Sequence, residues 1–216
     1  MNPATLVQGS EEWRKYKCGR LGGSSISQMM AKSRDKKTWG TTRETLLTRL
    51  VVERMTGCPQ DSYVSEAMKR GTETEAQARS MYCLLNNCDV EQAGWIDHPT
   101  IKFAGMSPDG LVGQSGLVEF KCPESKKHMG SLLGGSIDRE YLMQVQWQMA
   151  CTGRDWVDFA TYDPRWPPEM QLLVTRVPRD DVVIANLELE AVVFLKEVED
   201  TVSQLRAKYQ LLEAAE

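Results

Sequence analysis

The chain has 216 residues, of which 41% are hydrophobic and 26% charged, and its formal net charge is −4. This length suits one domain with a substantial buried core, and the composition excludes a disordered or fibrous protein. Because the sequence has neither a long uninterrupted apolar run nor a basic-then-apolar N-terminus, we expect no membrane span and no secretory signal, and a cytoplasmic location.

The hydrophobic periodicity predicts alternating helices and strands. Helices are expected at residues 10–17, 24–32, 42–56, 63–87, 137–152 and 180–214. Strands are expected at residues 89–97, 101–106, 117–122, 155–162 and 170–177. Thr41 and Glu44 have the spacing of a capping box, and Gly57 suits a helix end. With no internal repeat or linker, these elements predict one domain over residues 1–216, an α/β fold with a central mixed sheet flanked by helices.

The C-terminal helix expected at about 180–214 carries an apolar stripe. Its members are Leu187, Val192, Leu195, Val198, Val202, Leu205, Tyr209 and Leu212. Such a stripe most often packs onto its own sheet, and an exposed part could instead hold a neighbouring subunit or another partner.

The cysteine and histidine content bears on metal chemistry. Six cysteines are scattered without a Cys-x-x-Cys pair, and the chain has two histidines. This pattern argues against zinc or iron–sulfur sites and predicts reduced, mostly buried thiols.

The most informative segment is Ser107-Pro108-Asp109, followed ten residues after the aspartate by Glu119-Phe120-Lys121. Turn signals place Asp109 at the end of one short strand and Glu119 on the next. Since side chains alternate along a strand, Glu119 and Lys121 share one face, which we expect to line a cleft, while Phe120 faces the core.

Two carboxylates and a lysine at this spacing are the parts of a magnesium-dependent phosphodiesterase. Asp109 and Glu119 can converge on Mg²⁺, which prefers oxygen ligands, and Lys121 can orient the attacking water or stabilise developing charge. A second ion about 4 Å away would clamp the leaving oxygen. The alternative is that Glu119 and Lys121 merely pair across a solvated strand face, a contact worth about 0–1 kcal/mol.

These residues resemble the PD-(D/E)xK nuclease signature, and the surrounding segments are similar to the lambda exonuclease type of viral recombinase, the alkaline exonucleases. The similar segments occur in the same order through most of the chain, at residues 12–19, 71–75, 106–110, 119–123, 133–135, 141–146 and 162–165.

The resemblance implies roles for individual residues at the metal centre. Asp109, Glu119 and the backbone carbonyl of Phe120 would be metal ligands, and Lys121 would be the catalytic lysine. Glu75 would help to hold a second ion, although its spacing alone favours an exposed helix glutamate. Two Mg²⁺ ions are implied, with Mn²⁺ able to substitute.

The resemblance also implies a substrate pocket. Gln144 would touch the attacked phosphate, and Ser24 and Ser107 would bind the 5′ phosphate; alone, they would be interpreted as a half-buried helix amide and two turn or N-cap residues. The arginine of this pocket is replaced here by Lys17, which lacks the bidentate guanidinium. We therefore expect 5′ phosphate recognition with altered geometry, in which the nearby Arg20 could share.

Other positions bear on DNA binding. Met68 falls where the family has an apolar wedge at the terminal base pair, and a core methionine is an equally good interpretation. Although the net charge is negative, local cations are what neutralise phosphates. The sequence provides two basic clusters, each of which would alone suggest a solvated loop: Lys32, Arg34, Lys36 and Lys37, and then Lys126 and Lys127.

The resemblance thus implies a processive 5′ to 3′ exonuclease of linear double-stranded DNA that releases mononucleotides and leaves 3′ overhangs for phage-type recombination by single-strand annealing. It also implies a homotrimeric ring in a bacterial host cytoplasm and a phage single-strand annealing protein as partner. The alternatives are a PD-(D/E)xK endonuclease of the restriction or repair type and a catalytically silent DNA clamp or loading platform.

Overall fold

The structure is a computed structural model that describes residues 2–35, 37–60 and 66–209, with the side chains of residues 66–73 set aside. The predictions made for Lys36, Leu212 and the side chain of Met68 lie outside the described residues.

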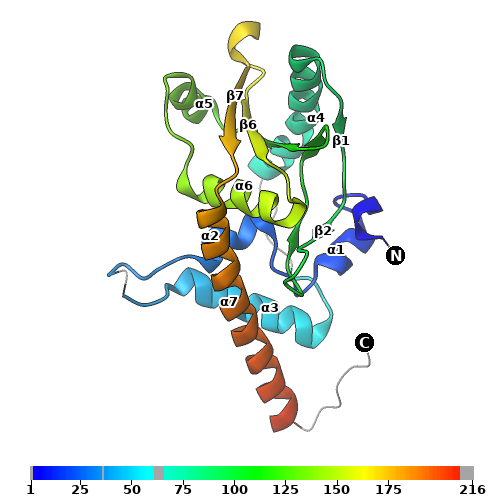
Figure 1. Ribbon diagram of the computed structural model, residues 1–216, viewed down its shortest axis with the longest axis vertical. Helices are drawn as coiled ribbons and strands as arrows, with labels where there is room; N and C mark the ends of the chain where they lie inside the picture. The colour runs from blue at the N-terminus through cyan, green and yellow to red at the C-terminus, as the bar shows by residue number, and fades with distance from the viewer. Residues whose placement is uncertain (1, 36, 61–65, 210–216) are drawn as a thin grey trace.

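A five-stranded sheet in the order β1-β4-β5-β6-β7 forms the centre (Figure 1). Its strands are β1 (Val90–Glu91), β4 (Gly110–Val112), β5 (Gly116–Lys121), β6 (Trp156–Tyr162) and β7 (Leu172–Pro178). β5 and β6 are parallel and the other pairs antiparallel. The parallel pair needs a crossover, which α5 (Ser125–Leu132) and α6 (Arg139–Thr152) supply. A second sheet pairs β2 (Ile96–Asp97) with β3 (Gly105–Met106).

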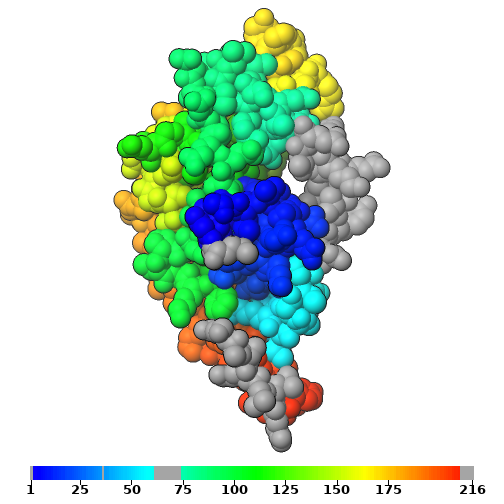
Figure 2. Space-filling model, turned by 90° about the vertical axis from the view of Figure 1, so that its right-hand side faces the viewer, coloured from blue at the N-terminus to red at the C-terminus, as the bar shows by residue number. Residues whose placement is uncertain are grey.

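Helices flank both faces of the central sheet, which confirms the predicted fold class. The remaining helices are α1 (Glu11–Lys17), α2 (Ile26–Met29), α3 (Thr41–Thr56), α4 (Glu66–Asn86) and α7 (Asp181–Lys208). Short 3-10 turns occur at η1 (Pro3–Thr5), η2 (Gly23–Ser25) and η3 (Pro168–Met170). α4 packs on one face of the sheet and α6 on the other, while α7 extends beyond the sheet beside α3 (Figure 1). In Figure 2 the N-terminal residues, in blue, lie between the α4 and α3 regions of the surface.

Several strands differ from the prediction. The strand expected at 89–97 is broken into β1 and β2, because Gly94 passes so close to Leu6 that a Cβ atom would lie 2.1 Å from the Leu6 carbonyl oxygen. The strand expected at 101–106 shrinks to β3, because Phe103 has a left-handed backbone (φ 60°).

Strand β4 and helix α5 were not predicted. Gly110 begins β4 instead of forming a turn after a strand, so the expectation that Asp109 ends a strand is wrong. The glycine is needed here for close packing, since a Cβ atom on Gly110 would lie 2.1 Å from Val90 Cγ1.

The helices follow the prediction more closely. The helix expected at 24–32 is only the short pair η2 and α2. Gly40 is the N-cap of α3 and no side chain caps it, so the predicted capping box does not form. Gly57 ends α3 in the left-handed conformation (φ 66°), as predicted.

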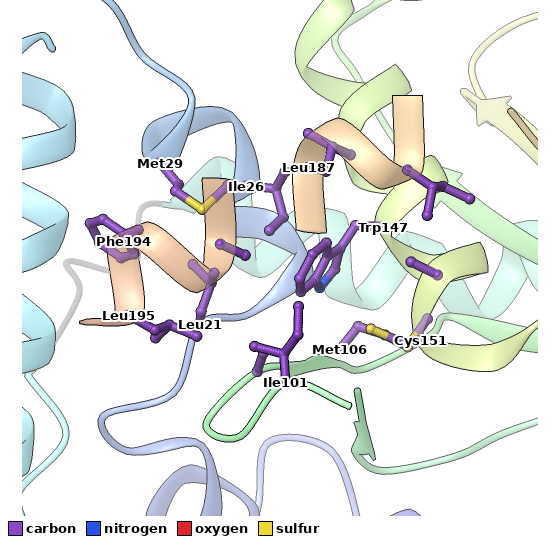
Figure 3. Close-up of a cluster of buried hydrophobic side chains, with 14 of the residues drawn as sticks. Leu21, Ile26, Met29, Ile101, Met106, Trp147, Cys151, Leu187, Phe194 and Leu195 are labelled. Carbon is purple, nitrogen blue, oxygen red and sulfur yellow. The ribbon is translucent and has the colours of Figure 1, made fainter. Parts of the chain in front are cut away.

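Helix α7 buries one face in the main hydrophobic core (Figure 3). Four members of the predicted stripe, Leu187, Leu195, Val198 and Val202, are buried, whereas Val192 and Tyr209 are 52% and 65% exposed. Ile184 and Phe194, which were not predicted as members, are also buried. The buried Arg43 of α3 lies between the rings of Trp39 and Phe194, at 4.0 and 4.6 Å from their centres. The stripe therefore packs mainly within its own chain.

The face of the sheet under α4 is held by a polar network at its edge. Tyr82 of α4 donates a hydrogen bond of 2.7 Å to the buried Asp158 of β6, which Arg176 of β7 also contacts through two bonds of 2.8 and 2.9 Å. Burial and the bond to Asp158 raise the pKa of Tyr82, so the phenol stays neutral and donates.

We expect Tyr82→Phe to lower the free energy of unfolding by about 1–2 kcal/mol, because a buried hydrogen bond is lost while the ring stays packed. Urea denaturation measures this loss, and Tyr209→Phe, at an exposed position, is the matched control. Equal denaturation midpoints for Tyr82→Phe and the parent would contradict the role given to this network.

Two composition-based predictions can be compared with the structure. Of the six cysteines, Cys151 is buried, Cys58 is exposed and the others are partly exposed, so the expectation of mostly buried thiols is wrong. Within the described ranges, no helix combines the length and the apolar character needed to cross a membrane.

Candidate active site

Strand pairing brings Asp109 beside the Glu-x-Lys strand. β4 and β5 are antiparallel, with Gly110 opposite Val118. Asp109, the residue before β4, accepts a hydrogen bond of 2.8 Å at Oδ2 from the backbone N–H of Phe120. The aspartate is therefore fixed against β5 next to Glu119.

Glu119 is 2% exposed, and its carboxylate is held by three side chains. Oε1 accepts from Lys121 Nζ at 2.6 Å and from Gln144 Nε2 at 2.7 Å, while Oε2 accepts from Gln148 Nε2 at 2.5 Å. As predicted from strand alternation, Phe120 faces the opposite side and packs in the cluster beneath α4. The sequence interpretation missed Gln148, although its spacing of four from Gln144 places both on one face of α6.

The carboxylates of Asp109, Glu119 and Glu75 lie close enough to affect one another's ionisation. Burial raises the pKa of Asp109 well above its usual range, and the charges of Glu119 and Glu75 raise it further. Burial opposes the charge on Lys121, but Glu119 and Asp109 outweigh this effect and raise its pKa, so the lysine is cationic. Because the charges of Glu119 and Glu75 raise the pKa of Asp109, a further positive charge bound among the three carboxylates would be favoured.

The donor set fits a hard divalent ion. No group of three or more His, Cys, Asp or Glu side chains is arranged to hold a metal ion in the described part of the chain. Mg²⁺, however, commonly takes one or two carboxylates and completes its shell with water and phosphate oxygens. Gln148 Oε1 beside Glu119 is buried without a hydrogen-bond partner, which fits a water molecule bound at this place.

Helix α4 brings a third carboxylate to the cleft. Glu75 Oε1 accepts from Arg79 Nη2 at 2.7 Å, and the same nitrogen lies 3.3 Å from the carbonyl oxygen of Asp109. Glu75 is thus partly buried at the site, contrary to the exposed helix position that its spacing alone favours. Arg79 links α4 to the start of β4 and was not identified from the sequence.

One cleft of about 260 Å³ unites the predicted metal and phosphate residues. Its lining includes Asp109, Glu119, Lys121, Gln144, Glu75, Lys17, Ser24 and Ser107. Lys17 Nζ lies 3.6 Å from the centre of the Trp13 ring, and Trp13 Nε1 donates to Ser107 Oγ at 2.9 Å. Residues that lie far apart in the sequence therefore share one cleft.

Arg49 lies beside Lys17. Arg49 of α3 lines an adjoining pocket of about 320 Å³ together with Lys17 and Ser24. Its Nη2 donates to Ser25 Oγ at 3.1 Å, but its Nε is buried without a partner. Burial and the charge of Arg49 lower the pKa of Lys17 to about 8. The pocket also holds the buried Glu53 carboxylate, but its cations, Arg14, Lys17, Arg20 and Arg49, outnumber this one anion, which makes the pocket suitable for a phosphate.

Arg20 is differently placed. Its guanidinium stacks on Tyr16 at 4.3 Å, its Nε donates to the Tyr16 carbonyl, and its Nη1 lies 3.5 Å from Asp97. It lines the adjoining pocket with Lys17, but not the cleft that holds the carboxylates. Neither Arg20 nor Arg49 lines that cleft, but the Arg20 guanidinium is engaged by Tyr16 and Asp97, whereas Arg49 Nε has no partner, so Arg49 is the better candidate for a phosphate.

The two predicted basic clusters are at the surface. Lys32 Nζ lies 3.0 Å from the centre of the Trp39 ring, while Arg34 and Lys37 are exposed. Lys126 is exposed in α5, and its neighbour Lys127 pairs with Asp138 at 2.7 Å.

The fold is that of the PD-(D/E)xK nucleases, and Asp109, Glu119 and Lys121 lie together in its cleft. Residues 12–155 match the YqaJ-like viral recombinase domain. The chain therefore belongs to the YqaJ-like viral recombinase family, whose members include nucleases of recombination, as the predicted resemblance implied.

Solved structures agree with this assignment. The chain is 40% identical to an alkaline exonuclease, LHK-Exo, from Laribacter hongkongensis, with a TM-score of 0.86 over 93% of this chain and 98% of that one. A structure of LHK-Exo in complex with dAMP gives 41% identity and a TM-score of 0.85 over the same shares. A phage-related exonuclease from Haemophilus somnus, at 14% identity and a TM-score of 0.65 over 86% of this chain and 96% of that one, shows the same fold.

A curated relative matches over a shorter region. An uncharacterized protein of Acanthamoeba polyphaga mimivirus is 30% identical over 102 residues. The match spans 41% of this chain and 19% of the viral protein.

Proposed function

We propose that the protein is a Mg²⁺-dependent exonuclease that digests the 5′-ended strand of linear double-stranded DNA processively and leaves 3′ single strands for recombination by strand annealing. The observation that carries this proposal is the single cleft in which the Asp109, Glu119 and Lys121 centre adjoins the cationic pocket of Lys17. A centre that shares one cleft with an anion pocket suits removal of a terminal nucleotide.

The residues have distinct parts in this mechanism. Bound Mg²⁺ would activate a water molecule and neutralise charge on the attacked phosphate, and Mn²⁺ would substitute. Asp109, Glu119 and the Phe120 carbonyl would hold one ion, and Glu75 would help to hold a second. Gln144 and Gln148 keep the Glu119 carboxylate in place.

Lys121 is the proton-bearing group beside the reacting atoms. In the metal-free protein its raised pKa keeps it charged, and as a cation it would stabilise negative charge on the attacked phosphate. Gln144, whose Oε1 lies 3.3 Å from Lys121 Nζ, orients the ammonium. The product would be a mononucleotide, which agrees with a relative, LHK-Exo, that has been crystallised in complex with dAMP.

The direct test is digestion of linear duplex with Mg²⁺ and with EDTA. We expect the metal-containing reaction to release mononucleotides and to leave 3′ single strand, and the EDTA reaction to leave the duplex intact. Nicking of a covalently closed circular plasmid would contradict an exonuclease and indicate an endonuclease. Intact binding without metal-dependent turnover would indicate a silent clamp.

The preference for a 5′ phosphate is expected to depend on pH. Lys17 has a pKa of about 8 in the free protein, so it is charged below this pH and neutral above it. The ratio of kcat/KM for phosphorylated over hydroxyl ends should therefore fall as pH rises through about 8, because kcat/KM reports the free enzyme. In Lys17→Arg the side chain stays charged, and the ratio should become independent of pH. A parent ratio that is flat between pH 7 and 9 would contradict this.

The proposal extends to assembly and partners. By family resemblance, the chain would form a homotrimeric ring that threads the DNA and would work in the host cytoplasm with a phage single-strand annealing protein. Light scattering after gel filtration tests the ring, and a monomer or dimer at working concentration would contradict it.

A further inference from the structure

A further cavity, separate from the cleft and the Lys17 pocket, adjoins the proposed nuclease centre at Lys121. It has a volume of about 270 Å³ and lies among α5, the start of α6, and the strands β6 and β7. Among the described residues that line the two spaces, Lys121 is the one that they share. The cavity therefore begins where the proposed catalytic cleft ends.

The walls of this cavity combine apolar surface with a few polar groups. The rings of Tyr141 and Phe159 lie there, with centres 5.5 Å apart and an interplanar angle of 32°, together with the side chain of Leu173. Lys121 Nζ and Lys127 Nζ each lie 4.9 Å from the centre of the Tyr141 ring. A nucleoside has the matching chemistry, since its base is flat and apolar on its faces and polar at its edges.

One polar group in the wall lacks a partner. Thr161 is 6% exposed, and its Oγ1 atom is buried without a hydrogen bond. Strand register places Thr161 of β6 directly beside Lys121 of β5. Buried hydroxyls are nearly always hydrogen-bonded, and since Thr161 lines the cavity, a rotation of its side chain would let the hydroxyl meet a bound ligand.

We propose that this cavity is a nucleoside subsite for the strand under digestion, on the 3′ side of the attacked phosphate. The inference rests on the proposed function. With the 5′ phosphate held near Lys17 and the attacked phosphate between Asp109 and Lys121, the terminal nucleoside fills the cleft between them. The strand then continues past Lys121, and the second nucleoside meets Tyr141 and Thr161.

The test uses linear duplexes with a 5′ phosphate and an abasic residue at either the second or the eighth nucleotide of the digested strand. Binding is measured by fluorescence anisotropy with Ca²⁺ in place of Mg²⁺, and release of the first nucleotide is measured with Mg²⁺. We expect the abasic residue at the second nucleotide to weaken binding by about 5- to 150-fold, the loss of one base–aromatic stack, and the one at the eighth to have no effect.

Variants then assign the effect to the cavity. Tyr141→Leu should bind the two duplexes equally, whereas Tyr209→Leu, at an exposed tyrosine of the far end of α7, should keep the parent's difference. Thr161→Val removes a buried hydroxyl without a protein partner, so it should unfold at the parent's midpoint or above it and bind the natural duplex several-fold more weakly.

Two results would overturn the subsite. One is a parent protein that binds and digests both duplexes equally, which leaves the nuclease function intact. The other is an abasic effect that persists unchanged in Tyr141→Leu. A parent protein that digests no linear DNA with Mg²⁺ overturns the proposed function as well, so the two failures are distinguishable.

Discussion

Asp109→Asn and Lys121→Ala are each expected to reduce Mg²⁺-dependent digestion of linear duplex by at least about 10³-fold. Asp109 is fixed against β5 by its bond to the Phe120 N–H, and Lys121 is the cation that lies against Glu119. Loss of a charged group that acts on the attacked phosphate commonly lowers rates by about 10²–10³-fold, and loss of a metal ligand adds to this.

The Asp109 variant also separates catalysis from folding. Because burial and neighbouring carboxylates raise the pKa of Asp109 in the folded protein, its ionisation opposes folding, and this cost appears as pH rises through the folded-state pKa. In EDTA at pH 8, Asp109→Asn should therefore unfold at the same or a higher urea concentration than the parent, although it is inactive.

Matched controls are available at exposed positions. Asp89→Ala and Lys102→Ala remove the same types of charge from the surface and should digest DNA at the parent rate. Active Asp109→Asn or Lys121→Ala protein would show that the centre has been wrongly assigned. An inactive variant that has also lost its cooperative unfolding transition would have to be replaced by Asp109→Glu before it is interpreted.

Arg49→Ala is expected to lower the preference for 5′-phosphorylated over 5′-hydroxyl ends by about 10- to 100-fold. Its Nε is buried without a partner next to Lys17, and charge-assisted hydrogen bonds to a phosphate contribute about 1.5–3 kcal/mol. The loss should appear as a higher KM for phosphorylated ends, with digestion of hydroxyl ends changed little, since those ends offer no anion.

Arg49→Ala should also raise the pKa of Lys17. Without the repulsion from Arg49, the pKa of Lys17 should rise, although burial, the larger cause of its lowering, keeps it below its ordinary value. The pH at which the phosphate preference falls should therefore move upward in Arg49→Ala. Arg206→Ala on α7 is the matched control, and equal end preferences in Arg49→Ala and Arg206→Ala would contradict the assignment of Arg49 to the pocket.

Much of the nuclease centre was predictable because it is local in the sequence. Asp109 and the Glu119-x-Lys121 pair lie close to one hairpin, so strand alternation and the turn signal before Gly116 brought them together, although the turn predicted at Gly110 is wrong. The exact strand boundaries were less predictable. The pair Asp109-Gly110 is typical of a turn, but Gly110 packs against Val90 and begins a strand.

The residues that the sequence interpretation missed are those whose partners are distant in the chain. Arg49 has no local pattern that distinguishes it from other exposed helix arginines, and its place beside Lys17 follows from packing of α3 against the N-terminal segment. Gln148 and Arg79 likewise have roles only because α6 and α4 cross opposite faces of the sheet.

The sequence by itself determined the fold class and the grouping of Asp109, Glu119 and Lys121, because alternation and turn chemistry act over a few residues. Tertiary structure decided that Lys17 and Arg49 share a pocket next to that centre, and that a cavity with an unpaired Thr161 hydroxyl continues beyond Lys121. Those features depend on burial and on the electrostatics of groups brought together from separate elements, and neither quantity is encoded in local spacing.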